Sequence, residues 1–284
     1  MTEKKKILIT GATGFIGQST VLALAEEGWH ITQGTRSDSD GMPEGVVFLN
    51  LEDPASLIAL EKGPRFDAIV HLGARVDLSS EMNADMFTSN VLSTGCLTYL
   101  AKFWKAHFIY ASTAIVHGGR TENINIESPI DLDTVYAKSK YLGEQLLAAS
   151  NIKHCILRIV GVYGCDGPAH LGLNRAINGA MKGEAPIQIG TGSALRNYIY
   201  VKDVAQAIVY ALQQNLSGVH LLAGHEVLSF AEMLKQICDT FASGIQPVIK
   251  DGTEAMNQVV NPSSYLPQTR SFQDALFDLQ KGCQ

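Results

Sequence analysis

The sequence has few of the features that mark secreted, metal-binding and membrane proteins. Its five cysteines, at positions 96, 155, 165, 238 and 283, form no Cys-x-x-Cys pair and have no His at zinc-ligand spacing. Such scattered cysteines are typical of single buried thiols in a reducing compartment, so we predict no metal site. No apolar run approaches the ~20 residues of a membrane helix, and no signal-peptide h-region follows the basic start of the chain. We therefore expect a soluble, cytoplasmic protein.

Positive charge is also scarce. Lys and Arg number 22 against 28 Asp and Glu, which gives a formal net charge of −6. Binding to nucleic acid or to an anionic membrane through bulk charge is therefore not expected, and any phosphate group must be held by a local arrangement. Hydrophobic residues make up 46% of the 284 residues, which is enough for a sizeable buried core.

The first two-thirds of the chain alternates short apolar segments with helical patterns. Strands are expected at 7–10, 31–34, 45–49, 67–72, 108–111 and 154–159, and helices at 15–27, 54–62, 83–103 and 134–149. Short, continuously apolar strands separated by helices predict an α/β fold with a doubly wound parallel sheet covered on both faces. After about residue 165 the pattern loosens, with helices expected at 174–182, 202–213 and 230–241 and strands at 197–201 and 219–222.

A glycine-rich loop follows the first expected strand and opens the first helix. It runs from Thr10 to Gly17, and its glycines are Gly11, Gly14 and Gly17. The first permits a tight turn, the second lets the backbone approach a pyrophosphate, and the third lets the helix pack closely on the strand. The free N–H groups of the helix N-terminus then face the phosphates. The loop predicts a Rossmann-type dinucleotide site, whose cofactor-binding residues include Thr13, Phe15 and Ile16 as well as the three glycines.

The end of the second strand indicates which dinucleotide is bound. The residue expected at the adenosine ribose lies about 20 positions after the loop, where Arg36 and Ser37 stand. An acid there would bond the 2′-hydroxyl of NAD, whereas the Arg36 guanidinium offers several donors to a 2′-phosphate. We predict NADP as the cofactor, with NAD as the alternative because Asp38 follows closely.

Two segments match the pattern Tyr-x-x-x-Lys, Tyr136–Lys140 and Tyr198–Lys202, so the pattern alone identifies neither. The first opens a strongly helical run, in which residues four apart share one face. The second lies in a β-branched and aromatic stretch, where a strand would separate the two side chains by about 13 Å. A Lys ammonium near a Tyr hydroxyl lowers the pKa of the phenol, so Tyr136 is predicted to exchange protons near neutral pH and Tyr198 to be structural.

Together these segments resemble the extended short-chain dehydrogenase/reductases, the group of NAD(P)-dependent sugar-nucleotide epimerases, dehydratases and reductases. The resemblance covers nearly the whole chain. Its segments are Thr10–Gly17, Asn50-Leu51, His71–Ala74, Asn90–Gly95, the strand end from Phe108 to Gly118, Tyr136–Lys140, Arg158–Gly164 and Arg196–Asp203.

The resemblance implies roles for individual residues. Thr113 would hydrogen-bond the reacting oxygen, with Ser112 as a second donor to the substrate, and Lys140 would also hold the nicotinamide ribose. Further cofactor contacts are implied for Asn50, Leu51, Leu72, Gly73 and Ala74, and a place near the active site for Asn90. Arg196 would bind the nucleotide diphosphate of the substrate.

The chain departs from the family pattern at three positions. His117 replaces the usual Tyr, and we expect it to be either a packed residue or one that faces the sugar. Gly161 stands where many members carry an Asn that contacts the substrate phosphate, and Asn197 stands where Asp often follows the Arg.

The combined interpretation is an NADP(H)-dependent reductase of a 4-keto, 6-deoxy sugar nucleotide, in which Tyr136 provides the proton. The first alternative is an epimerase with tightly bound NAD(P), and the second is a non-catalytic NADP-sensing protein. A dehydratase is less favoured because Ala114 and Ile115, not an acid pair, follow Thr113. We expect a Rossmann domain at 1–165, a substrate-binding segment at 166–284 that partly returns to the first sheet, and a homodimer formed through the helices at 83–103 and 134–149.

Overall fold

The computed structural model describes the chain except for residues 1–4, 37–43, 78–80, 82–83 and 283–284. Two compact units divide it. The first comprises residues 1–118, 129–158 and 205–220, and the second comprises residues 119–128, 159–204 and 221–284. The boundary expected near residue 165 therefore falls between Arg158 and Ile159, and residues 205–220 return to the first unit.

A seven-stranded sheet forms the centre of the first unit, in the order β12-β7-β5-β4-β1-β2-β3. Its strands are β1 (Lys6–Thr10), β2 (His30–Thr35), β3 (Val46–Phe48), β4 (Ala68–His71), β5 (His107–Thr113), β7 (His154–Ile159) and β12 (Gly218–Leu222). The pairs from β3 to β5 are parallel, with Thr10 beside Gly34 on one side and beside His71 on the other. The order reverses between β1 and β4, which is where α/β sheets of this type bind their ligands.

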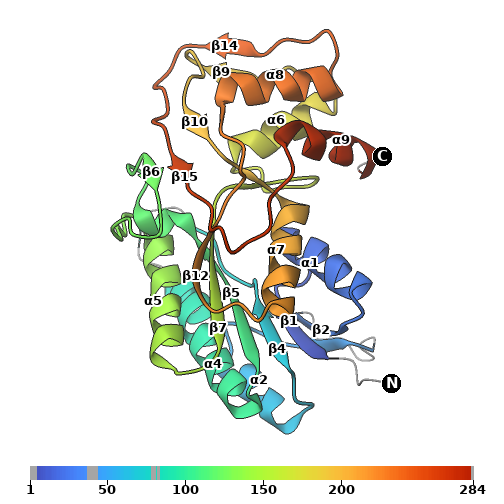
Figure 1. Cartoon of the computed structure of the whole chain (residues 1–284), viewed down its shortest axis with the longest axis vertical. Helices are drawn as coiled ribbons and strands as arrows, with labels where there is room; N and C mark the ends of the chain where they lie inside the picture. The colour runs from blue at the N-terminus through green and yellow to red at the C-terminus, as the bar shows by residue number, and fades with distance from the viewer. Residues whose placement is uncertain (1–4, 37–43, 78–80, 82–83, 283–284) are drawn as a thin grey trace. The chain divides into compact units, whose positions relative to one another are not determined.

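Helices cover both faces of this sheet (Figure 1). One layer contains α2 (Pro54–Ala59), a 3₁₀ turn (Leu60–Lys62), α4 (Ser93–Trp104) and α5 (Val135–Ala149), and the other contains α1 (Phe15–Glu26) and the later part of α7 (Val201–Gln213). The core between sheet and helices includes the fully buried Leu8, Ile69, Leu97 and Phe108. The prediction of a Rossmann-type doubly wound sheet is confirmed, and most expected elements of this unit agree with the structure within two residues.

The long helix expected at 83–103 is divided into three parts. Within the described residues, α3 (Ala84–Phe87) leads into a π-helical turn (Thr88–Leu92), and α4 follows. Single π-turns widen a helix locally and often occur at functional sites. Asn90, which the resemblance places near the active site, lies in this turn.

The second unit contains four short two-stranded sheets and three helices among its described residues. The sheets pair β10 (Leu195–Arg196) with β13 (Leu228–Ser229), β11 (Ile199–Tyr200) with β8 (Val162–Tyr163), β14 (Val248–Lys250) with β9 (Ile187–Ile189), and β15 (Val259–Val260) with β6 (Asn123–Ile124). The helices are α6 (Gly172–Ala180), α8 (Phe230–Phe241) and α9 (Phe272–Gly282). Of the expected strand at 197–201 only Ile199–Tyr200 (β11) is a strand, and α9 was not predicted.

The cysteines only partly match the expectation. Cys96, Cys155 and Cys238 are free thiols, but Cys165 is disulfide-bonded, so the prediction of isolated thiols is wrong at that position. Cys283 lies outside the described residues. None of the helices in the described parts of the chain combines the length and apolar character needed to cross a membrane.

Candidate active site

The glycine loop sits tightly between the ends of β1 and β4. Gly11 has a φ of 70°, and a Cβ there would lie 2.6 Å from the Gly73 backbone nitrogen. A Cβ at Gly17 would lie 2.0 Å from the Gly11 carbonyl oxygen. Side chains at either position would therefore collide with backbone, which explains the two glycines and confirms the close approach expected from the sequence.

The N-terminus of α1 is open to an anion. Gly14 is its N-cap residue and provides no side-chain cap, and the first turn contains no acidic residue. The first N–H groups of a helix have no intrahelical partner, and the helix dipole favours negative charge at this end. The loop and helix therefore fit the pyrophosphate of a dinucleotide.

The residues expected at the adenosine lie beside this loop on the sheet edge. Arg36 follows β2 directly and is exposed, whereas Ser37 lies outside the described residues. Leu51 packs close to Gly73, since a Cβ at that glycine would lie 2.6 Å from the leucine Cδ1 atom. The Asn50 side chain accepts a hydrogen bond from the Glu52 backbone, which fixes the turn after β3.

Asn90 joins three segments of the first unit. Its Oδ1 accepts from the Arg75 backbone N–H at 2.8 Å, and its Nδ2 donates to the Arg75 carbonyl and to the Ser139 hydroxyl. Ser139 in turn donates to the Tyr136 carbonyl at 2.8 Å. The π-helical turn thus connects the chain after β4 to the helical turn that carries Tyr136, which is a structural role beside the active site.

Tyr136 and Lys140 lie one helical turn apart in α5, as the periodicity predicts. The Thr134 side chain caps this helix by accepting from the Ala137 N–H. Lys140 is 2% exposed, and its Nζ lies 4.1 Å from the centre of the Tyr110 ring. Gly143 makes this packing possible because a Cβ there would lie 2.3 Å from the Tyr110 hydroxyl. No pattern in the sequence singles out Tyr110 beyond its place in an apolar strand.

The pKa values in this site differ from the expectation. Burial raises the pKa of Tyr136 to about 12 and lowers the pKa of Lys140 to about 7, against the opposing effect of Glu144 on the lysine. Desolvation therefore outweighs the attraction of the Lys140 ammonium, which was expected to lower the pKa of Tyr136 towards neutral pH. At neutral pH the Tyr136 hydroxyl is therefore protonated.

Thr113 ends β5 and caps the short 3₁₀ helix Ala114–His117. Its Oγ1 accepts a hydrogen bond from the Ile115 N–H at 3.3 Å. Because a hydroxyl has one donor and two acceptor positions, the Thr113 proton remains available for a second oxygen. This arrangement is consistent with the expected contact to a reacting oxygen.

Ser112 and His117 do not have the surroundings expected of substrate contacts. Ser112 is 5% exposed and donates to Glu144 at 2.5 Å. His117 is fully buried, its Nδ1 donates to the Pro129 carbonyl, and its Nε2 accepts from Arg158. Both side chains are already engaged inside the protein, so the geometry supports the packed alternative for His117 and argues against a substrate contact for either residue.

Glu144 and Arg158 form a buried ion pair that the sequence analysis missed. The distance from Arg158 Nη2 to Glu144 Oε2 is 2.7 Å, and the side chains are 9% and 2% exposed. Arg158 Nε adds contacts of 3.1 and 3.3 Å to the two carboxylate oxygens. The sequence shows that Glu144 follows Lys140 by one helical turn, but this spacing does not indicate Arg158 as its partner.

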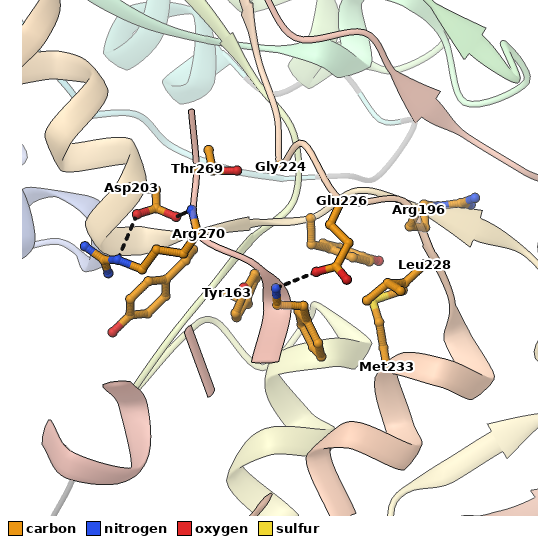
Figure 2. A pocket seen from close by; sticks show the side chains of 12 residues that line it. Tyr163, Arg196, Asp203, Gly224, Glu226, Leu228, Met233, Thr269 and Arg270 are labelled. Carbon is orange, nitrogen blue, oxygen red and sulfur yellow. Dashed lines mark hydrogen bonds and ion pairs between the residues drawn. The ribbon is translucent and has the colours of Figure 1, made fainter. Parts of the chain in front are cut away.

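Arg196 lies in the second unit among residues that line a small pocket. Its guanidinium donates to the Leu195 and Met256 carbonyls and lies 5.7 Å from the centre of the Phe230 ring. Figure 2 shows Arg196 on the opposite side of the labelled residues from the Asp203–Arg270 pair. The Arg270 backbone N–H donates to Asp203 at 3.0 Å, and the two side chains approach to 3.4 Å.

The departure at Gly161 has a structural explanation. A Cβ at this position would lie 2.4 Å from the Tyr198 ring. The tyrosine therefore occupies the space that an Asn side chain would need, and the Gly161 carbonyl accepts from the Ile199 N–H at 3.0 Å. Lys202 lies in α7 and pairs with Asp278 at 2.8 Å.

The sheet order and the glycine loop are those of a dinucleotide-binding α/β fold. A family model of the NAD dependent epimerase/dehydratase family matches residues 7–224, and the chain belongs to that family. It is an NAD(P)-dependent enzyme of the extended short-chain dehydrogenase/reductase type, as the resemblance implied.

Solved structures share this fold at low sequence identity. One is a putative epimerase from Burkholderia cenocepacia, with 17% identity, 98% of this chain and 97% of that chain covered, and a TM-score of 0.84. Another is the dTDP-4-dehydrorhamnose reductase of Bacillus anthracis in complex with NADP, with 17% identity, 99% of both chains covered and a TM-score of 0.83. A third is the UDP-glucose 4-epimerase of Thermus thermophilus in complex with NAD, with 22% identity, 98% and 100% coverage and a TM-score of 0.81.

Proposed function

We propose that the protein is an NADP(H)-dependent reductase of a 4-keto, 6-deoxy sugar nucleotide. The observation that carries the choice of cofactor is the exposed Arg36 at the end of β2, in a sheet whose register places Gly34 beside Thr10. A guanidinium beside the pyrophosphate loop favours a ribose with a 2′-phosphate. The dTDP-4-dehydrorhamnose reductase of Bacillus anthracis, solved with NADP, supports the same choice.

The proposed chemistry uses three side chains of the first unit. When bound, NADPH supplies a hydride to the carbonyl carbon of the substrate. Tyr136, whose pKa is raised to about 12, donates its phenolic proton to the carbonyl oxygen. Thr113 accepts from the Ile115 N–H and directs its own proton to the same oxygen, which stabilises developing negative charge. Lys140 holds the ribose next to the reacting centre.

The direct test is NADPH consumption with CDP-, GDP-, dTDP- and UDP-linked 4-keto-6-deoxy sugars. We expect oxidation of NADPH with one of these nucleotides. Sugar interconversion without added cofactor would instead support the epimerase, which the likeness to the Thermus thermophilus UDP-glucose 4-epimerase keeps as the second candidate. Tight NADPH binding with no turnover of any sugar nucleotide would support the sensing protein.

The cofactor assignment predicts a selective effect of Arg36→Ala. The variant should weaken NADPH binding by roughly 1.5–3 kcal/mol, because it removes a charge-assisted contact to the 2′-phosphate, and should leave NADH binding nearly unchanged. Fluorescence titration with both reduced cofactors measures the difference. Exposed Arg75, which pairs with Glu52 and Asp85, offers Arg75→Ala as a charge-matched control. An equal loss for the two cofactors in Arg36→Ala would contradict the assignment.

Arg196 stays our proposed contact to the substrate diphosphate. It can serve there only if the substrate competes with the Leu195 and Met256 carbonyls for its donors. Arg196→Met should raise the KM for the sugar nucleotide and leave NADPH affinity unchanged. An unchanged KM would favour a simpler ketone or aldehyde as the substrate.

We also propose a homodimer formed through α4 and α5. Large apolar side chains are exposed along these helices and the π-helical turn before them. They are Leu92, Tyr99, Phe103, Leu142 and Leu146, which are 39% to 48% exposed. A second copy of the chain would cover this surface in a twofold arrangement. Light scattering that gave the monomer mass at micromolar concentration would overturn the proposal.

A further inference from the structure

Glu144 is a buried carboxylate at the junction of α5 and β5. It lies one helical turn after Lys140 and is 2% exposed. Burying a carboxylate is costly unless its oxygens receive hydrogen bonds, and Glu144 receives them from Ser112 and from two nitrogens of Arg158. Glu144 and Arg158 therefore place two charges inside the protein, where apolar side chains would have a lower free-energy cost of desolvation.

The bond from Ser112 connects Glu144 to the residue that is expected to touch the substrate. Ser112 directly precedes Thr113 at the end of β5. Because the Ser112 hydroxyl is hydrogen-bonded to α5, this bond opposes a shift of the strand end relative to the helix that carries Tyr136. The spacing between the Thr113 and Tyr136 hydroxyls then depends on Glu144.

The carboxylate also acts on Lys140. Within the described residues, the Lys140 ammonium has the Tyr110 ring as its partner and no hydrogen bond or ion pair. Burial lowers the pKa of this lysine, and Glu144 is the group that raises it. Among the described residues, the other titratable groups beside the lysine are His71, whose own pKa falls through burial and the nearby ammonium, and Tyr110, whose ring lies against the ammonium. An ammonium buried in this way needs a negative charge nearby to stay protonated.

Arg158 and His117 hold Glu144 in place. The Arg158 guanidinium contacts Glu144 on one side and His117 on the other. His117 donates to the Pro129 carbonyl through Nδ1, so Nε2 is the acceptor and the ring is the neutral tautomer. The histidine that replaces the tyrosine of the family pattern thus anchors the arginine.

We propose that Glu144 is a positioning residue of the active site, which helps to fix Thr113 through Ser112 and, standing one helical turn after Lys140 in α5, favours the charged form of that lysine. Its effect on turnover rests on the proposed function. Its effect on the lysine does not, because protonation of Lys140 can be measured without any substrate.

The test is a pH titration of ¹³C-lysine-labelled protein by NMR, with the Lys140 signal assigned by its loss in Lys140→Arg. In Glu144→Gln the titration midpoint of Lys140 should fall by about one pH unit or more, because the opposite charge is gone. Glu144→Asp and Ser112→Ala keep the charge and should leave the midpoint nearly unchanged. Asp203→Asn, which breaks the ion pair of the second unit, controls for general loss of stability. An unchanged midpoint in folded Glu144→Gln would overturn the proposal.

A second variant covers the case in which Glu144→Gln does not fold. Glu144→Gln with Arg158→Gln removes both members of the ion pair, so Arg158 is not left without its carboxylate, and it should also lower the Lys140 midpoint because the carboxylate is the group that acts on the lysine. Once a substrate is found, Ser112→Ala should lower kcat about tenfold with KM and NADPH affinity unchanged, since only the placement of Thr113 changes. An unchanged kcat would refute the part of the proposal that concerns Thr113. The titration of Lys140 does not depend on this result, because it needs no substrate.

Discussion

The two Tyr-x-x-x-Lys segments share one spacing and differ in almost everything else. Tyr136 and Lys140 lie in the same helix, α5, in the first unit. Tyr198 lies between β10 and β11 in the second unit, and Lys202 lies in the first turn of α7. In the first case the spacing is one turn of a continuous helix, and in the second the strand β11 and the start of α7 separate the two residues.

Their surroundings differ as much as their backbones. Lys140 is 2% exposed, against the Tyr110 ring, whereas Lys202 has a 48% exposed side chain that pairs with Asp278. Tyr198 packs edge-to-face against Phe230, with ring centres 6.2 Å apart. The fold therefore buries the cation of the first segment and leaves that of the second in an exposed ion pair, although burial raises the pKa of both tyrosines.

The largest expected effect separates the two tyrosines. Tyr136→Phe retains the ring but removes the proton, so kcat should fall by about 10²-fold or more while NADPH binding is kept. Tyr198→Phe should change the chemical step little. Single-turnover measurements of NADPH oxidation would compare them, and a reversed pair of results would show that the choice between the two segments is wrong.

The two lysines should differ in how their removal changes stability with pH. The pKa of Lys140 is about 7 in the folded protein and about 10.4 in the unfolded chain, so the unfolded chain binds more protons between these values. The stability of the wild type therefore gains from this residue as the pH rises from about 7 to about 10. Lys140→Met should be more stable than the wild type near pH 7, by roughly 1–3 kcal/mol, and this advantage should shrink towards pH 10.

Lys202→Met is the matched control for that prediction. It loses an exposed ion pair, which is worth about 1 kcal/mol or less, and should show no comparable change between pH 7 and pH 10. Urea unfolding at several pH values measures both variants. Parallel stability curves for wild type and Lys140→Met would mean that the buried lysine keeps its ordinary pKa.

The smallest expected effect concerns the glycine beneath Tyr110. Gly143→Ala gains about 1 kcal/mol of helix propensity, but its Cβ would lie 2.3 Å from the Tyr110 hydroxyl, and such overpacking costs about 1–3 kcal/mol. We expect a net loss of stability. Gly95→Ala in α4 would place its Cβ at an ordinary 3.7 Å from Leu146 and should be neutral or stabilising. Thermal unfolding measures the change in stability of each variant. A stabilised Gly143→Ala would contradict the close packing of Gly143 on Tyr110, the ring against which Lys140 lies.

The sequence by itself determined the sheet, the glycine loop and the helix that carries Tyr136. Apolar runs, helical periodicity and closely spaced glycines are local patterns, and each has a short-range physical reason. These patterns gave no role to Asn90 or Thr113, whose predicted roles came from the family resemblance.

Only the tertiary structure decided how the polar groups of the site are paired. Glu144 meets Ser112 and Arg158 across separate elements, and His117 meets Arg158 across 41 positions of the chain. Sequence spacing carries no information on such contacts. Desolvation is also a property of the whole fold, since it depends on every element that covers a group. For that reason the opposite shifts of the Tyr136 and Lys140 pKa values could not be read from their spacing of one helical turn.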